Sequence, residues 1–366
     1  MSRIDDLIAE YCPDGVEYKR LGDVCKIKNG KDYKHLSAGD IPVYGSGGVM
    51  DVRVDTSVYN RPTVLLPRKG SIANVFYVDG PFWNVDTIFY TVIDEEQVIP
   101  RYLYHVMMNA HIENYSTGSA ARPSLTQSAL NKIEIPVPPL PVQEEIVRIL
   151  DSFSSLEAEL EAELEARRKQ YAYYRDQLIR DCPSIRWIPL SEISENCDKS
   201  RKPIKKEKRI AGKTPYYGAS GVVDYVDGFT HEGDYLLLSE DGANLLARSM
   251  PIAYQISGRN WINNHAHVLR IENANLRQLV EMYLNSISLE PYITKGAQPK
   301  LTKQRMETIA VPVPSEDYLS RIVEMLTKFY ALTTSLTDGL PAEIEARHKQ
   351  YEYYRDRLLS FDELAA

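Results

Sequence analysis

The chain has 366 residues, which exceeds one ordinary domain and fits two. Hydrophobic residues make up 43% and charged residues 26%, as in soluble globular proteins, and no apolar run reaches the ~20 residues of a membrane span. The four cysteines are far apart and form no C-x-x-C pair, which excludes a disulfide framework and favours a cytoplasmic protein with reduced thiols. The net charge of −8 excludes a chain that is basic throughout, but a local basic face is compatible with it, because salt screens charges beyond about 8 Å.

The predicted elements form two similar series along the chain. A short helix over residues 3–11, with Ile4, Leu7 and Ile8 on one face, opens the chain and ends before Pro13. The first series has strands at 64–66, 88–93 and 134–139 and a short helix at 101–110. The second series has strands at 235–238, 267–271 and 309–314 and a short helix at 275–286.

A long helix follows each series. The expected division is therefore a first globular domain at 1–141, a helix at 142–181, a second globular domain at 182–314 and a helical segment at 315–366. This alternation of mixed domains and long helices predicts an α+β fold.

An internal repeat explains the two series. Residues 165–179 and 345–359 are identical at eleven of fifteen positions, at an offset of 180, and the glycine-rich blocks 42–51 and 215–224 also match. Single residues have counterparts in the same order: Cys12 and Cys182, Trp83 and Trp261, and Leu125 and Leu301. The chain is therefore predicted to be a tandem duplication of a unit of roughly 175 residues.

Apolar residues in the long helices recur every three or four positions, which is typical of a coiled coil. The seam of the first helix comprises Phe153, Leu156, Leu160, Leu164, Tyr171, Tyr174 and Leu178. The seam of the second comprises Phe329, Leu332, Leu336, Ile344, Tyr351, Tyr354 and Leu358. The offset between the copies rises from 176 to 180 near 338–341, which predicts an extra turn and a break, because Gly339 can end a helix and Pro341 can begin one.

The link after the first long helix is short, so we expect the second helix to begin near its end and to run back antiparallel, with pseudo-twofold symmetry. The short helix at 3–11 is then expected where the last helix ends, which would bring the two termini together.

Three segments resemble the specificity (S) subunit of type I restriction–modification enzymes: residues 42–48, 136–146 and 339–356. The resemblance covers essentially the whole chain. It implies two target recognition domains, each reading one half of a bipartite asymmetric DNA site, and two helices that set the gap between the half-sites. It also implies docking of two methyltransferase (M) subunits, with restriction (R) subunits joining that core. No cofactor is expected in this chain, whereas S-adenosylmethionine, ATP and Mg²⁺ are expected in the partner subunits.

Candidate DNA contacts are charged or polar residues on expected loops, because Lys, Arg and small polar groups bind phosphates, and charged or polar side chains read base edges. In the first domain they are Lys26, Lys28, Lys31, Tyr33, Lys34, Tyr44, Ser46, Arg68, Lys69, Ser119 and Arg122. In the second domain they are Lys199, Arg201, Lys202, Lys205, Lys206, Lys208, Arg209, Tyr217, Ser220, Glu240, Asp241, Asn244, Asn263, Asn264, His265, Lys295, Gln298 and Lys300.

Each candidate group also has a structural interpretation. The basic run 199–209 could be a solvated surface, and the glycine-rich blocks could be tight turns without a phosphate. The turns 68–70 and 240–242 occupy equivalent places but differ in charge, as expected of a base-reading loop that has changed specificity. Asn263 could cap a strand, and both Trp83 and Trp261 are expected in the core.

Motifs for chemistry are absent from the sequence. Gly212-Lys213-Thr214 resembles the end of a phosphate-binding loop, but Glu207 stands where its first glycine is required. No Asn-Pro-Pro-Tyr or Asp-Pro-Pro-Tyr methyltransferase motif occurs, and the histidines lack metal-ligand spacing. We therefore expect no catalytic residue and no metal in this chain.

Three alternatives remain at this point. The chain could serve a related system whose partner both methylates and cuts, which a neighbouring reading frame for a separate translocase would exclude. It could be a coiled-coil scaffold that does not bind DNA, although the divergence of the two domains disfavours this. It could also be a self-sufficient DNA enzyme, which would be active when purified alone.

Overall fold

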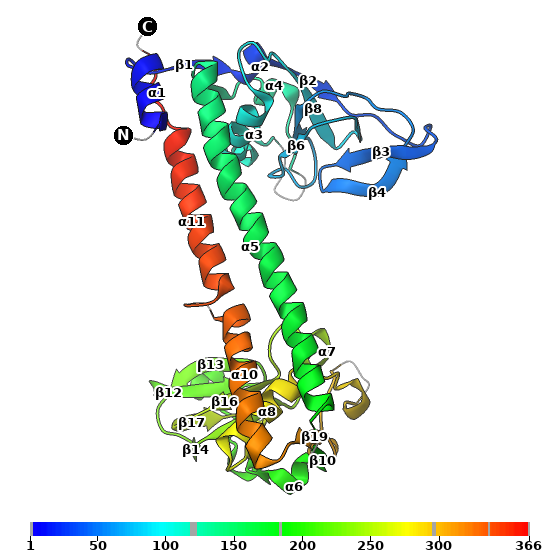
Figure 1. The fold of residues 1–366 in the computed structure, drawn as a ribbon, viewed down its shortest axis with the longest axis vertical. Coiled ribbons are helices and arrows are strands. Elements are labelled where there is room, and N and C mark those ends of the chain that lie inside the picture. The colour runs from blue at the N-terminus through cyan, green and yellow to red at the C-terminus, as the bar shows by residue number, and fades with distance from the viewer. Residues whose placement is uncertain (1–2, 118–122, 183–184, 295–297, 336, 365–366) are drawn as a thin grey trace. The chain divides into compact units, whose positions relative to one another are not determined.

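The computed structural model describes residues 3–117, 123–182, 185–294, 298–335 and 337–364 (Figure 1). Contacts divide the chain into two units: unit 1 contains Met1–Ala162 and Ala342–Ala366, and unit 2 contains Glu163–Pro341. Helix α5 (Leu140–Arg180) has 41 residues and contributes to both units.

The described residues of unit 1 form three sheets. The four-stranded sheet has the order β2-β8-β5-β6, with bounds Cys25–Asn29, Ile88–Ile93, Thr63–Pro67 and Phe76–Val78. The three-stranded sheet has the order β4-β3-β7, with bounds Gly48–Val54, Ala38–Gly45 and Trp83–Asn84. Strand β1 (Glu17–Arg20) pairs with β9 (Glu134–Val137). The helices are α1 (Arg3–Tyr11), α2 (Leu21–Val24), α3 (Pro100–Asn109), the 3-10 helix η1 (Ile112–Tyr115) and α4 (Gln127–Leu130).

Unit 2 repeats this arrangement. One four-stranded sheet has the order β11-β18-β15-β16, with bounds Glu195–Asn196, Ala266–Arg270, Tyr235–Ser239 and Ala253–Ile256. The other has the order β13-β12-β17-β14, with bounds Gly221–Val226, Ala211–Gly218, Arg259–Ile262 and His231–Glu232. Strand β10 (Arg186–Pro189) pairs with β19 (Ala310–Val313). The helices are α6 (Leu190–Ile193), η2 (Asp198–Ser200), η3 (Lys206–Lys208), α7 (Asn244–Ala247), α8 (Ala274–Leu284), η4 (Glu290–Tyr292), α9 (Lys303–Glu307) and α10 (Glu316–Thr334).

The central strands β5 and β15 are mostly apolar, and both of their faces are covered. All five residues of β5 are buried, and α3 packs against this strand. The equivalent strand β15 is likewise buried along its whole length. Near-continuous apolar strands of this kind predict burial on both faces, and each fully buried leucine contributes about 1.5–3 kcal/mol.

The duplication is visible in the strand register. Val43 of β3 lies opposite Trp83 of β7 in a parallel pair, and Tyr216 of β12 lies opposite Trp261 of β17 in the same way. Trp83 is buried, as expected, but Trp261 is only half-buried. Because the same parallel pairing occurs in both units, the repeat seen in the sequence is a repeat of fold.

Each unit contains an antiparallel helix pair. In unit 1, the ring of Phe153 stacks on that of Tyr354 at 5.3 Å, and His348 Nδ1 of α11 (Leu340–Leu358) lies 2.9 Å from Glu157 Oε1. In unit 2, the ring centroid of Tyr171 lies 5.9 Å from that of Tyr330. Residue numbers rise along α5 as they fall along the partner helices, so the expected antiparallel pairing is confirmed within each unit.

The predicted seam is only partly covered. Leu358 is buried, whereas Leu156, Tyr174 and Leu332 are 45%, 37% and 39% exposed. Leu336 lies outside the described residues, and the remaining seam positions are half-buried: Phe153, Leu160, Leu164, Tyr171, Leu178, Phe329, Ile344, Tyr351 and Tyr354. Each helix of a pair covers only one side of the other, so part of the apolar seam remains exposed to solvent.

The second helical segment is interrupted between Thr334, where α10 ends, and Leu340, where α11 begins. Gly339 lies against the end of α10, and a Cβ atom there would be 2.7 Å from the carbonyl oxygen of Ala331. The close backbone approach requires glycine at this position.

The two ends of the chain meet in unit 1. Val16 N donates to the carbonyl of Asp362 at 2.9 Å, and Leu364 N donates to the carbonyl of Val16 at 2.9 Å. Tyr18 Oη donates to the carbonyl of Phe361 at 3.0 Å. These bonds join the segment after α1 to the segment after α11, as the sequence predicted.

Candidate nucleic-acid interface

In unit 1, segments that contain candidate residues meet at the 85–87 loop. Ser46, at the tip of the β3–β4 hairpin, donates its backbone N–H to Thr87 Oγ1 at 3.2 Å. The backbone N–H groups of Arg68 and Lys69 donate to the carbonyl of Thr87 at 2.9 and 3.2 Å. A β-bridge joins Lys69 to Ser124. These contacts bring together the hairpin tip, the 68–70 turn, the 85–87 loop and Ser124.

Unit 2 brings the equivalent segments together. Glu240 N donates to the carbonyl of His265 at 2.9 Å, and Asn263 N donates to the carbonyl of Tyr217 at 3.1 Å. A β-bridge joins Asp241 to Lys300. The hairpin tip, the 240–242 turn, the 263–265 loop and Lys300 therefore form the counterpart of the unit 1 cluster.

Within this cluster, Glu240 is an internal anchor. It is 8% exposed, Arg201 Nη1 donates to its Oε2 at 2.5 Å, and Lys300 Nζ lies 3.0 Å from its Oε1. Burial raises the pKa of Glu240, but contacts with Arg201, His267 and Lys300 hold it below the ordinary value. Both carboxylate oxygens of Glu240 have cationic partners within the protein. Glu240, which was predicted to read a base, is therefore already bound by Arg201 and Lys300.

His267 ties this network to the strand beneath it. Its Nδ1 lies 2.7 Å from Asp198 Oδ2 and its Nε2 lies 2.8 Å from the carbonyl of Leu301, and the ring is 1% exposed. Both neighbours are oxygen acceptors, so the two ring nitrogens are placed to donate to them. Burial raises the pKa of Asp198, but its hydrogen bond from His267 and the charge of that ring outweigh burial and lower the pKa.

This network also contains a possible metal-ligand set. One ligand atom each from Asp198, Glu240 and His267 lie within 4.8 Å of one another. Arg201 Nη2 lies 3.2 Å from Asp198 Oδ2, and Lys300 also approaches this set. The carboxylates are therefore already neutralised by protein cations, and the residues do not fit a metal site.

Exposed candidates sit beside these anchored ones. Asp241 is half-buried and its Oδ1 lies 2.9 Å from Nδ1 of the exposed His265. Lys69 is exposed, and its Nζ lies 3.4 Å from Asp86 Oδ2. Asn264, Gln298 and Ser220 are also exposed, whereas Ser46 is half-buried. These side chains can reach a ligand outside the protein.

Asn263 and Asn244 have internal roles. Asn263 is 7% exposed, and its Oδ1 accepts from His265 N at 2.8 Å, which is the capping contact that the sequence left open. Asn244 Oδ1 accepts from Met250 N at 3.1 Å and its Nδ2 donates to the Met250 carbonyl at 3.0 Å. The amide groups of both residues therefore hold loops in place.

In the basic run 199–209, the two arginines are held by carboxylates of the protein, whereas the lysines are exposed. Arg201 is anchored as described, and Arg209 Nη1 lies 3.0 Å from Asp224 Oδ2 with its guanidinium 4.4 Å from the Tyr216 ring centroid. The exposed cations of the run are Lys199, Lys202, Lys205, Lys206 and Lys208. In unit 1 the exposed lysines at the matching place are Lys26, Lys28, Lys31 and Lys34.

Three tyrosines chosen as candidates pack against the protein. Tyr44 lies edge-on to Phe82 at 6.1 Å, and Tyr217 stacks on Tyr254 at 5.8 Å. Tyr33 is half-buried against the core that contains Trp83. Their rings support the hairpins, which leaves polar neighbours to make outside contacts. Ser119, Arg122 and Lys295 lie outside the described residues.

Thr87 and His267 are central to these clusters but were not predicted. The offset of 178 that relates Trp83 to Trp261 also pairs Thr87 with His265. Since His265 was a candidate, this offset would have identified Thr87 as a site residue. His267 lies in an apolar strand with no sequence sign of its distant partners Asp198 and Leu301.

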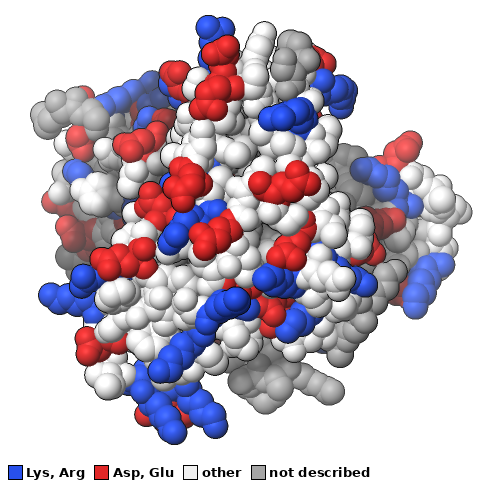
Figure 2. Space-filling view, turned by 90° about the horizontal axis from the view of Figure 1, so that it is seen from below, with Lys and Arg blue, Asp and Glu red and all other residues white. Residues whose placement is uncertain are grey.

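Figure 2 shows one face of the molecule, on which Lys and Arg are interspersed with Asp and Glu. A single broad basic surface is therefore absent from the described residues in this view, which fits the net charge of −8.

The sequence matches the type I restriction modification DNA specificity domain twice, over residues 13–166 and 187–346. The chain belongs to this family. Its two matches follow the tandem repeat, and they confirm the resemblance to specificity subunits.

Proteins with similar sequences are also named as specificity subunits of type I restriction enzymes. A Haemophilus influenzae protein, named as a type I restriction enzyme specificity subunit, is 37% identical over 184 residues, which cover 49% of this chain and 47% of that protein. The specificity subunit of a type I restriction enzyme of Escherichia coli is 32% identical over 296 residues, which cover 74% of this chain and 73% of that subunit. The matched region thus spans about half the length of the first relative.

The fold of a specificity subunit is also found in solved structures. The S subunit of a type I restriction–modification system from M. genitalium has a TM-score of 0.62 at 18% identity, covering 94% of this chain and 96% of that chain. This likeness confirms the predicted α+β fold with tandem mixed domains and long helices. None of the helices in the described residues has the length and apolar character needed to cross a membrane.

Proposed function

We propose that each recognition domain of this specificity subunit reads one half of a bipartite, asymmetric DNA site. The observation that carries this proposal is the pair of equivalent loop clusters, which share a backbone frame and differ in side chains. At the same turn, unit 1 presents Lys69 and unit 2 presents Asp241. Two different half-sites require the same backbone arrangement with different side chains at the reading positions.

The chemistry of the two turns predicts different bases. A lysine donates to acceptors such as O6 and N7 of guanine, whereas an aspartate accepts from the amino group of cytosine or adenine. The exposed lysines of the basic run and of the matching unit 1 segment would contact phosphates, which position the protein without reading sequence.

In the same proposal, the helices set the gap between half-sites and dock two M subunits, and R subunits complete the assembly. Exposed apolar positions such as Leu156 and Leu332 support a role in docking, because apolar patches on helices favour protein contacts. Chemistry would belong to the partners, which would bind S-adenosylmethionine, ATP and Mg²⁺, while this chain would be non-catalytic and act on double-stranded DNA.

Selection from a random duplex library by the chain assembled with its M subunit tests the proposal. We expect the bound fraction to be enriched in two short sequences separated by a fixed gap. A library that stays unenriched, with equal binding to all duplexes, would instead favour a scaffold that does not read DNA.

A further inference from the structure

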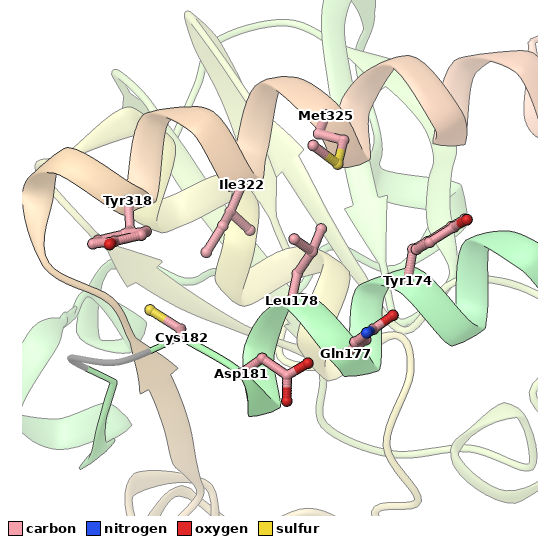
Figure 3. Close-up of a pocket in the computed structure, with 8 residues that line it drawn as sticks. All are labelled: Tyr174, Gln177, Leu178, Asp181, Cys182, Tyr318, Ile322 and Met325. Carbon is pink, nitrogen blue, oxygen red and sulfur yellow. The ribbon is translucent and has the colours of Figure 1, made fainter.

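An apolar groove lies in unit 2 between the end of α5 and the first half of α10. Its volume is about 390 Å³ (Figure 3). Leu178 and Ile322 face each other at its centre, with Met325 and Tyr174 toward one end and Tyr318 toward the other. Tyr318 and Met325 are 42% and 45% exposed, so the groove leaves large apolar side chains in contact with water.

Unit 1 contains the counterpart of this groove. The stacked pair Phe153–Tyr354 corresponds to Phe329–Tyr174, whose ring centroids are 5.8 Å apart, and it aligns the two helix pairs residue by residue. At these offsets, the groove residues of α10 correspond to Val142, Ile146 and Ile149 of α5, and Leu178 corresponds to Leu358 of α11.

In unit 1 this surface is covered by α1. Ile4 is 6% exposed and belongs to the same buried cluster as Val142, Ile146 and Leu358. Arg3 Nε lies 3.5 Å from Oε2 of Glu145, on the same stripe of α5. Figure 1 shows α1 beside the ends of both helices. A short amphipathic helix therefore fills the first groove.

The described part of unit 2 has no separate helix in this place. In unit 1, α1 is the helix that precedes β1. In unit 2, the helix that precedes β10 is α5 itself, which runs to Arg180. The second copy of the repeat thus keeps the groove and lacks the helix that covers it.

The charge beside the two grooves is reversed. Glu145 of unit 1 corresponds to Arg321 of unit 2, which is exposed and has no ion-pair partner among the described residues. A helix seated like α1 would therefore need a carboxylate where α1 has Arg3, because a second cation there would be repelled.

We propose that this groove receives a short amphipathic helix from another polypeptide, with the apolar spacing of α1 and an acidic residue opposite Arg321. The inference rests on the proposed function only in that an assembly of subunits would supply such a helix. It adds to that function the docking site and the chemistry of its occupant.

A peptide of residues 3–11, held helical by a lactam bridge on its exposed face, can serve as the probe. Fluorescence anisotropy with the full chain should show one saturable site for the Arg3→Glu peptide and roughly fivefold weaker binding of the unchanged peptide. Met325→Asp should weaken binding at least tenfold, whereas Met250→Asp, at a methionine that is 52% exposed outside the groove, should not. Arg321→Glu should reverse the preference between the two peptides.

The inference is overturned if neither peptide saturates, if Met325→Asp has no effect, or if Arg321→Glu leaves the preference unchanged. Concentration-dependent dimerisation that Met325→Asp abolishes would assign the groove to a second copy of this chain instead. Since the assay contains no DNA, loss of peptide binding and loss of sequence-specific DNA binding are separate outcomes.

Discussion

His265 Nδ1 lies 2.9 Å from Asp241 Oδ1, and the equivalent turn and loop of unit 1 hold Lys69 Nζ 3.4 Å from Asp86 Oδ2. The two units therefore keep a polar side-chain pair at one place in the fold, with the carboxylate on the turn in unit 2 and on the facing loop in unit 1. In both pairs the turn residue has a partner that is at least partly exposed, so a base edge can compete for it.

Asp241→Asn should relax DNA specificity at one base pair. The substitution keeps the shape of the side chain but removes the charge that accepts from a base amino group, so discrimination there should fall by about 1–3 kcal/mol. The salt dependence of binding should stay unchanged, since no phosphate contact is lost. Competition binding with single-base variants of the selected site measures this, and Asp227→Asn, at an exposed aspartate outside the cluster, serves as the control.

Replacing Lys205, Lys206 and Lys208 together with alanine should weaken binding to every DNA sequence. If all three contact phosphates, the slope of log K against log salt should fall by about 2.7, or about 0.9 per contact. Titrations at several salt concentrations measure the slope. A slope equal to that of the unaltered chain would remove this run from the DNA footprint.

Arg209 belongs to a different class and is therefore left intact in that variant. Its pKa is raised by the hydrogen bond to Asp224, and its guanidinium packs on Tyr216. Arg209→Ala should lower the thermal stability of the chain more than it changes the salt slope.

The repeat explains why so much of the fold could be predicted from the sequence. Apart from the short helix at 3–11, each expected strand and helix has a second copy, and heptads mark both long helices. The pairing of Phe153 with Tyr354 follows from that pattern, because apolar seams pack together.

The site was harder to predict because its decisive contacts join residues far apart in the chain. Glu240 and Arg201 are 39 residues apart, and Asp198 and His267 are 69 apart. Both Glu240 and Arg201 were expected to face DNA as polar residues on loops, and only the folded structure shows that they hold each other. Residue type alone cannot distinguish a reader from an anchor.

The anchor predicts a specific response to acid. The pKa values of Asp198 and Glu240 are lowered in the folded chain, whereas unfolded carboxyl groups titrate near pH ~4. Their stabilisation is therefore fully present above that unfolded value and is lost as the pH falls through the lower folded values.

Glu240→Gln should consequently lose stability at pH 7 and show a smaller further loss between pH ~5 and ~3 than the unaltered chain. Calorimetric melting at these pH values measures both effects. Glu232→Gln removes an exposed partner of Arg259 and should change neither by much. An unaltered acid response in the Glu240 variant would contradict the anchoring role.

Gly339→Ala should destabilise the helix interruption. The added Cβ would meet the backbone oxygens of Ala331 and Leu332 at 2.7 and 2.9 Å, so the chain must shift, at a cost of about 1–3 kcal/mol. Gly47→Ala is the matched control, because nothing lies within 4 Å of a Cβ at that position. Equal melting temperatures for the two variants would show that the close approach at Gly339 is unimportant.

Methylome sequencing of cells that express this chain with its M subunit tests the central claim most directly. The unaltered chain should direct methylation to a two-part motif with a fixed gap. Lys69→Asp should change only one half of that motif, and Asp241→Lys only the other half. A continuous motif, or a motif in which either substitution alters both halves or neither, would contradict the assignment of one half-site to each unit.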